Sequence, residues 1–144
     1  ELVAKALFSL ADRAEQRNVA VCMETHDDWT DPNHVAAIMR KVNRPGIAVN
    51  WDIMHPVRTS GFSIEDSYAI VKPWIRHVHF HDGTKDRQLK PIGQGIVDHK
   101  AAVKLLMNDG YSGFLSGEWI KWEIPYTEHL PTEIQTMKRY ESEA

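Results

Sequence analysis

Two periodicities alternate along this chain. Segments in which apolar residues recur every three or four positions predict amphipathic helices, and the short β-rich runs between them predict strands. The predicted helices cover residues 1–17, 32–42, 64–72 and 99–109, and a last helix follows from residue 131. The predicted strands cover residues 18–25, 47–52, 75–81 and 113–119. Strands that alternate with helices are typical of parallel βαβ units, so the pattern predicts an α/β fold with parallel strands.

The predicted helices begin and end at suitable capping residues. Asp31 stands before Pro32, and Ser63 and Asp98 stand before the two later helices. Short polar side chains at these positions accept hydrogen bonds from the first free amides of a helix. Gly110 follows the fourth helix as a C-terminal glycine signal. The first helix is expected to turn one stripe toward the core: Leu2, Val3, Ala6, Leu7, Leu10 and Ala14.

Side chains on alternate positions of the four strands share one polar or small face. Because neighbouring residues of a strand point to opposite faces, the residues of this face follow at every second position. They are Ala20, Cys22 and Glu24, then Ala48, Asn50 and Asp52, then His77, His79 and His81, and finally Ser116 and Glu118. The intervening positions are mostly apolar and are expected to pack on the helices. Buried charge is costly when unpaired, so the polar face must line something that satisfies it.

The carboxyl end of every predicted strand carries a group that could bind a metal. These groups are Glu24, Asp52, His79 and Glu118. Active sites of parallel α/β folds lie at this end of the sheet. Three carboxylates and one imidazole suit one divalent ion, Mn²⁺, Mg²⁺, Co²⁺ or Zn²⁺. The alternatives are that His79 is a hydrogen-bonded core histidine, that Asp52 caps a turn, and that the two glutamates lie on the surface.

Composition and charge narrow the function classes. The 144 residues carry a formal net charge of −3 and no long run of lysine or arginine, which argues against nucleic-acid binding. No apolar run reaches the roughly 18 residues of a membrane span. The single cysteine, Cys22, favours a reducing, cytoplasmic location. The chain begins at Glu1, inside a predicted helix, and is expected to be a piece of something longer.

Several motifs in this order resemble those of the sugar phosphate isomerase/epimerase superfamily, the xylose-isomerase-like TIM barrels. The motifs are "VCMETH" (21–26), "VNWDIMH" (49–55), "RHVHFHDG" (76–83), "PIGQGIVDHKAAVKLLMNDGYSGFLSGEW" (91–119) and "EWIKWEIP" (118–125). The resemblance implies that residues 1–144 form the C-terminal half of a (β/α)₈ barrel, about four βα units, with the N-terminal half absent. A closed barrel needs eight strands and about 250 residues. We therefore expect a homo-oligomer or association with a missing half barrel.

The resemblance also implies a site and an activity. The family's four metal ligands correspond to Glu24, Asp52, His79 and Glu118, of which Glu24 and Glu118 would also be catalytic. His55 takes the place of a substrate-binding histidine. Lys85 and Arg87 both lie near the place of a substrate-binding arginine that has no clean match here. His26 and His81 are further candidates for lining the pocket.

The implied activity is that of a metal-dependent isomerase or epimerase acting on a small sugar or polyol in carbohydrate metabolism. It would transfer a proton at a carbon next to a carbonyl through an enediolate-like intermediate. One alternative is a metal phosphodiesterase of the apurinic-endonuclease branch, which needs several zinc ions and a basic surface. The other is a half barrel that binds metal without turnover. The glycines of 93–95 favour a plain turn over a phosphate-binding loop.

Overall fold

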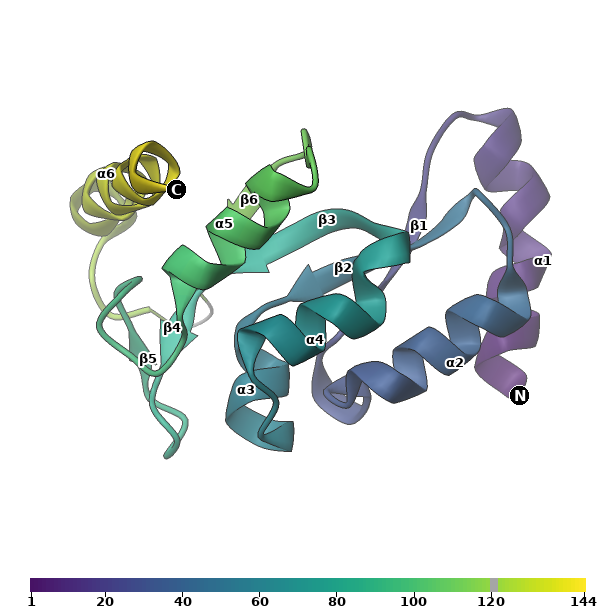
Figure 1. Cartoon of the computed structure of the whole chain (residues 1–144), viewed down its shortest axis with the longest axis horizontal. Helices are drawn as coiled ribbons and strands as arrows, with labels where there is room; N and C mark the ends of the chain where they lie inside the picture. The colour runs from purple at the N-terminus through teal and green to yellow at the C-terminus, as the bar shows by residue number, and fades with distance from the viewer. Residues whose placement is uncertain (120–121) are drawn as a thin grey trace.

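A computed structural model describes residues 1–119 and 122–144 of the chain (Figure 1). The motif at 118–125 therefore includes two positions, 120 and 121, that lie outside the described residues. The helices are α1 (Leu2–Gln16), α2 (Pro32–Val42), α3 (Met54–Ser60), α4 (Ile64–Val71), α5 (His99–Asn108) and α6 (Tyr126–Glu143). The strands are β1 (Val21–Glu24), β2 (Ile47–Asp52), β3 (Ile75–Phe80), β4 (Asp82–Gly83), β5 (Leu89–Lys90) and β6 (Leu115–Gly117). Short 3₁₀ turns cover Asp27–Trp29 and Lys72–Trp74.

Four of the strands form one parallel sheet in the order β1-β2-β3-β6. The predicted α/β fold with parallel strands is thus confirmed. Among the described residues β1 pairs only with β2, and β6 pairs only with β3, so each leaves one edge open. A strand edge with free amides and carbonyls is a place where another strand can add. Completion of these edges by a second half barrel stays a prediction.

The helices α1, α2, α4 and α5 follow one another along the sheet in the order of the strands they connect (Figure 1). They cover the apolar face that the alternation predicted, because Val49, Trp51, Val78 and Phe80 are all fully buried. The indole of Trp51 donates a hydrogen bond of 2.9 Å to the Ser67 hydroxyl on α4. The predicted inward positions therefore remain on the opposite face of the sheet.

Predicted helix starts are confirmed at three positions. The carboxylates of Asp31 and Asp98 and the hydroxyl of Ser63 each accept a hydrogen bond from a backbone amide in the first turn of their helix. Gly110 takes the expected left-handed conformation, with φ +71°. Local capping chemistry was thus a sound guide to where these helices begin.

Other predicted bounds were wrong. The predicted stripe of α1 is right only in part: Ala14 is buried and Val3 and Leu7 pack against the core, but Leu2 and Leu10 are 84% and 45% exposed. The last helix begins at Tyr126 rather than near residue 131, and Pro131 lies within it. The strands predicted over 18–25 and 113–119 shorten to Val21–Glu24 and Leu115–Gly117, and β3 ends one residue before His81.

The segment over 82–96, between the third predicted strand and the fourth predicted helix, contains two further strands. Strands β4 and β5 form an antiparallel pair, so this small unit departs from the parallel pattern. The carboxylate of Asp82, fully buried, accepts hydrogen bonds from the amides of Gly83, Gly93, Gly95 and Val97. The amides of Gly93 and Gly95 thus donate to a side chain of the same chain, and that of Gln94 donates to the carbonyl of Pro91, which agrees with a turn rather than a phosphate-binding loop.

Within the described ranges, every helix is too short or too polar to cross a membrane.

Candidate metal centre

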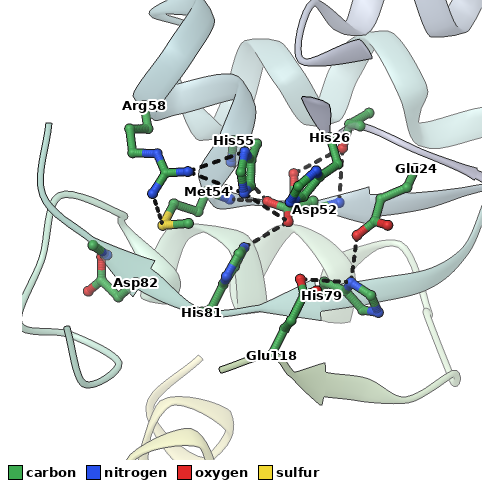
Figure 2. Close-up of polar contacts among 12 residues, drawn as sticks. Glu24, His26, Asp52, Met54, His55, Arg58, His79, His81, Asp82 and Glu118 are labelled. Carbon is green, nitrogen blue, oxygen red and sulfur yellow. Dashed lines mark hydrogen bonds and ion pairs between the residues drawn. The ribbon is translucent and has the colours of Figure 1, made fainter. Parts of the chain in front are cut away.

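The four residues predicted as metal ligands converge at the carboxyl ends of the parallel strands (Figure 2). β1 ends at Glu24, β2 ends at Asp52, His79 is the penultimate residue of β3, and Glu118 directly follows β6. One ligand atom from each lies within 4.8 Å of the other three. Bonds from small divalent ions to protein ligands are about 2.0–2.2 Å long, so atoms on opposite sides of an ion are roughly 4 Å apart. The spacing therefore suits one shared ion.

The strands bring these residues together although they do not lie at one level of the sheet. Asp52 is the register partner of His79. Glu24 pairs with Asn50, which lies two positions before Asp52 on β2 and so further from the carboxyl end of the sheet. Ser116 pairs with His79, so Glu118 lies two positions further out. Parallel strands in a barrel are staggered along the barrel axis, and that stagger compensates for such offsets.

Three of the ligand atoms lack a hydrogen-bond partner among the described residues. Nδ1 of His79 lies 2.6 Å from Oε1 of Glu24 and 3.4 Å from Oε2 of Glu118. All three atoms are buried, yet none is aligned for a hydrogen bond. Each buried polar atom left without a partner costs about 1–3 kcal/mol. Atoms that crowd together without bonding one another are arranged as ligands are around a common cation, and these donors fit Mn²⁺, Mg²⁺, Co²⁺ or Zn²⁺.

Asp52 is held rigidly in its position. Its Oδ1 accepts hydrogen bonds of 2.9 Å from the amides of Met54 and His55, and its Oδ2 lies 2.7 Å from Nε2 of His81. Burial disfavours the charged carboxylate, but the hydrogen bond and charge of His81 outweigh it, so the pKa of Asp52 lies below its ordinary value. Asp52 thus caps the turn into α3, as one alternative predicted, and remains available as an anionic ligand.

Thr25 positions this aspartate through the main chain. The Thr25 hydroxyl accepts a hydrogen bond of 2.9 Å from the amide of Asp52 and donates one of 3.0 Å to its carbonyl. The side chain is fully buried. It extends the pairing of β1 with β2 one step beyond Glu24 and so fixes the spacing of these two ligands. Sequence reasoning missed this role, for which the only signal was the place of Thr25 next to Glu24.

A cavity of about 210 Å³ reaches one of the four candidate ligands, Glu118. Of the residues predicted to contact substrate, His26, His55, His81 and Arg87 line it together with the ligand Glu118. Lys85 is exposed and is not among the lining residues. Of the two alternatives for a substrate-binding cation, the geometry therefore favours Arg87.

Arg58 also lines the cavity, although it was not predicted from the sequence. It lies on α3, a seven-residue helix that was not predicted either. Its Nη2 lies 3.3 Å from Nε2 of His55 (Figure 2). Asp52, His55 and Arg58 follow one another at intervals of three residues, the spacing that places side chains on one side of a helix. That spacing was the available signal.

His55 provides a test by pH. Burial disfavours its imidazolium and lowers the pKa to about 4, although the charge of Asp52 opposes this shift. The unfolded chain takes up this proton below about pH 6.5 and the folded chain does not until about pH 4. The free energy of unfolding should therefore fall as the pH drops from 6.5 toward 4, by on the order of 2 kcal/mol for this group.

Urea unfolding of the metal-free chain between pH 4.5 and 7.5 would measure this change. The His55→Gln variant should lose that part of the pH dependence, whereas His34→Gln, at an exposed position on α2, should keep it. Equal slopes for the wild type and His55→Gln would contradict the assignment.

Active sites of (β/α) barrels lie at the carboxyl ends of the parallel strands, where this chain groups its carboxylates and histidine. The chain belongs to the xylose isomerase-like TIM barrel family, whose model matches residues 1–140.

Several characterised proteins are similar to this chain. A 3-dehydroshikimate dehydratase of Bacillus anthracis is 27% identical over 118 residues, covering 80% of the chain and 41% of the relative. A D-allulose 3-epimerase of Methylomonas sp. matches with a TM-score of 0.81 at 18% identity, covering 95% of this chain and 54% of that one. A xylose isomerase-like protein of Mycobacterium smegmatis, solved in complex with magnesium, matches with a TM-score of 0.79 at 18% identity, covering 98% and 50%. The chain thus spans about half the length of the proteins it matches.

Proposed function

We propose that this chain carries the metal-dependent active site of an isomerase or epimerase that acts on a sugar or related polyol. The observation that carries the proposal is the convergence of Glu24, Asp52, His79 and Glu118, with three of their buried ligand atoms lacking a hydrogen-bond partner among the described residues. The similarity to a D-allulose 3-epimerase supports the class of reaction. The match to half of each relative supports a chain that forms the C-terminal half of a (β/α)₈ barrel.

The chemistry is a proton transfer at a carbon next to a carbonyl. When bound, a divalent cation there supplies Lewis-acid chemistry, which makes the neighbouring C–H bond more acidic. If each glutamate gave one oxygen to the cation, its other carboxylate oxygen could carry the proton. One glutamate removes the proton from the substrate carbon to give an enediolate-like intermediate. The other returns a proton to the opposite face, which gives epimerisation, or to the adjacent carbon, which gives isomerisation.

His55 would orient the substrate. With its pKa lowered to about 4, its imidazole is neutral at neutral pH and can exchange a hydrogen bond with a substrate hydroxyl. It lies on the wall of the cavity that also reaches Glu118. A neutral imidazole orients the substrate hydroxyl without adding a positive charge beside the proposed metal ligands.

Dehydration is a second candidate, favoured by the similarity to a 3-dehydroshikimate dehydratase. Its first step is the same removal of a proton next to a carbonyl. The electron pair then expels the hydroxyl on the next carbon, and that hydroxyl leaves as water after it takes up a proton. The two activities therefore share the metal centre and differ in where the second proton goes.

Epimerisation, isomerisation and dehydration all begin with removal of a proton next to a carbonyl. A solvent-exchange experiment tests this step for three classes of compound at once. The chain is incubated in D₂O with ketoses, inososes and 3-dehydroshikimate, with Mn²⁺ or with EDTA. We expect deuterium to enter at the carbon next to the carbonyl of at least one compound, with the exchange abolished by EDTA and restored by excess Mn²⁺. Exchange that persists in EDTA would contradict a metal-dependent reaction. Binding of several zinc ions per chain, instead of one divalent ion, would favour the phosphodiesterase alternative.

A further inference from the structure

His99 is a buried histidine that lies outside the proposed metal centre. It is the first residue of α5 and is only 2% exposed. Its Nε2 lies 3.0 Å from the carbonyl oxygen of His81, and its Nδ1 lies 3.0 Å from that of Val97. Carbonyl oxygens only accept hydrogen bonds, and a neutral imidazole carries a single N–H. The surroundings therefore decide which nitrogen of His99 carries the proton.

The carbonyl of His81 depends on this proton more than the carbonyl of Val97 does. The Val97 carbonyl already accepts the backbone amide of His99 at 3.1 Å. His81 is buried, and no backbone amide of the described chain donates to its carbonyl. A buried carbonyl without a donor is costly, so the geometry favours a proton on Nε2 of His99.

The charge of His99 does not alter this assignment. Oδ2 of Asp82 lies 3.8 Å from Nδ1 and favours an imidazolium, whereas burial lowers the pKa of His99 and favours the neutral ring. An imidazolium carries a proton on both nitrogens. In either charge state, Nε2 therefore donates to the carbonyl of His81.

This hydrogen bond reaches a residue that the sheet does not hold. β3 ends at Phe80, which pairs with Gly117, and the last pair on its other side joins His79 to Asp52. His81 thus lies one residue beyond the paired part of the sheet. Its ring nevertheless contacts a candidate metal ligand, because Nε2 of His81 lies 2.7 Å from Oδ2 of Asp52 (Figure 2). The ring can hold that carboxylate only while the backbone of His81 stays in place.

We propose that His99 is a positioning residue for the metal centre: its Nε2–H holds the carbonyl of His81, so that the ring of His81 orients the carboxylate of Asp52. The inference rests on the proposed function, because it concerns the geometry of the same centre. Groups that hydrogen-bond to metal ligands orient them, and loss of one typically lowers metal affinity about 10- to 100-fold. His99 acts one step further from the cation, so we expect an effect at the lower end of this range.

Packing is the alternative role for this ring. The centroid of the His99 ring lies 5.4 Å from that of Phe80 and 6.3 Å from that of Tyr140. A phenylalanine at position 99 would keep such aromatic contacts but has no donor for the carbonyl of His81. The His99→Phe variant therefore separates the hydrogen bond from the packing.

Two further variants test which nitrogen matters. The amide nitrogen of glutamine lies about as far from Cα as Nε2 of histidine, and that of asparagine about as far as Nδ1. His99→Gln can therefore keep the bond to His81, whereas His99→Asn can keep only the contact with Val97. The two variants have the same chemistry and differ in reach.

Calorimetry measures Mn²⁺ binding to the full chain, under conditions in which each protein is folded. We expect His99→Phe and His99→Asn to weaken Mn²⁺ binding about tenfold, and His99→Gln to stay within about threefold of the wild type. Leu106→Ala removes a buried side chain of α5 near the start of β3, at the other end of the sheet. It controls for lost stability and should leave Mn²⁺ affinity unchanged.

A second measurement needs no metal. Carboxylate oxygens only accept, so the contact of His81 with Asp52 places a proton on Nε2 of His81. In the metal-free chain this proton should give a slowly exchanging NMR signal in the wild type and in His99→Gln. The signal should be lost in His99→Phe and His99→Asn.

Three results would overturn the inference. They are an unchanged Mn²⁺ affinity and His81 signal in His99→Phe, wild-type behaviour of His99→Asn with loss in His99→Gln, and an equal loss of affinity in Leu106→Ala. Each leaves the proposed function standing as long as the wild type binds Mn²⁺. Failure of the wild type to bind Mn²⁺ would count against the proposed metal centre, and the signal of the metal-free chain would still decide whether His99 positions His81.

Discussion

The Glu118→Gln variant should exchange substrate C–H protons at least about 10³-fold more slowly than the wild type, while it keeps measurable affinity for Mn²⁺. General acid–base help from a positioned carboxylate is worth about 10²–10⁴-fold, and this residue would serve as base or acid in both halves of the reaction. Glutamine keeps an oxygen that can remain a ligand, but it cannot carry a proton. Deuterium incorporation followed by NMR, at Mn²⁺ concentrations that saturate each protein, measures the rate separately from metal binding.

Two further variants serve as a second test and as a control for this result. Glu24→Gln should also slow exchange, because the proposed mechanism needs both carboxylates. Glu65→Gln, at an exposed position in the first turn of α4, removes the same charge far from the site and should leave the rate unchanged. If Glu118→Gln exchanged protons at the wild-type rate on a true substrate, this glutamate would have no part in the proton transfer.

The four candidate metal ligands could be grouped from the sequence because two simple rules apply to them. Strands alternate their side chains between faces, and parallel strands end at the same edge of the sheet. Glu24, Asp52 and His79 lie at or next to the ends of strands whose places, though not all of their bounds, the apolar pattern located. Neither rule depends on how far one strand is displaced along its neighbour.

The substrate side of the site depends on contacts that these rules do not describe. Arg58 reaches the cavity only because a short helix follows Asp52 directly, and seven residues are too few to show a clear helical period. Thr25 acts through the backbone of another strand, 27 positions away. Such contacts are set by tertiary packing, and the local pattern carries only a weak sign of them: the three-residue spacing from Asp52 to Arg58 and the place of Thr25 beside Glu24.

The first helix shows the same limit. Its large apolar residues suggested a buried stripe that includes Leu2 and Leu10, yet those two are exposed and the buried residues of the helix are alanines. The backbone at the start of β2 approaches this face closely: a Cβ added at Gly46 would lie 2.8 Å from the side chain of Glu15 and 3.2 Å from that of Ala14. Small residues permit that approach, so the contact face was set by space and not by hydrophobicity alone.

Replacing Asp82 by asparagine should lower the free energy of unfolding by about 3–5 kcal/mol. The two carboxylate oxygens accept four backbone amides, with distances of 2.9 and 3.2 Å to Gly83 and Val97 and of 2.9 and 2.8 Å to Gly93 and Gly95. In asparagine one oxygen becomes an NH₂ donor that faces two other donors in a fully buried place. Two hydrogen bonds are lost, and each buried amide left unpaired costs about 1–3 kcal/mol. Urea denaturation of the metal-free chain at neutral pH measures the total.

The same substitution should open a defined part of the chain. Amides 93 and 95, which share one oxygen of Asp82, or amides 83 and 97, which share the other, should lose protection from hydrogen exchange. Asp66→Asn, at an exposed position on α4, should change the unfolding free energy by less than about 0.5 kcal/mol. The effect should also reach the candidate metal centre, because His81 directly precedes Asp82 and its ring bonds to Asp52. The carbonyl of His81 lies 3.0 Å from Nε2 of His99, so the backbone there is held from both sides. Unchanged protection and stability in Asp82→Asn would show that packing of the segment, and not this carboxylate, supports that side of the site.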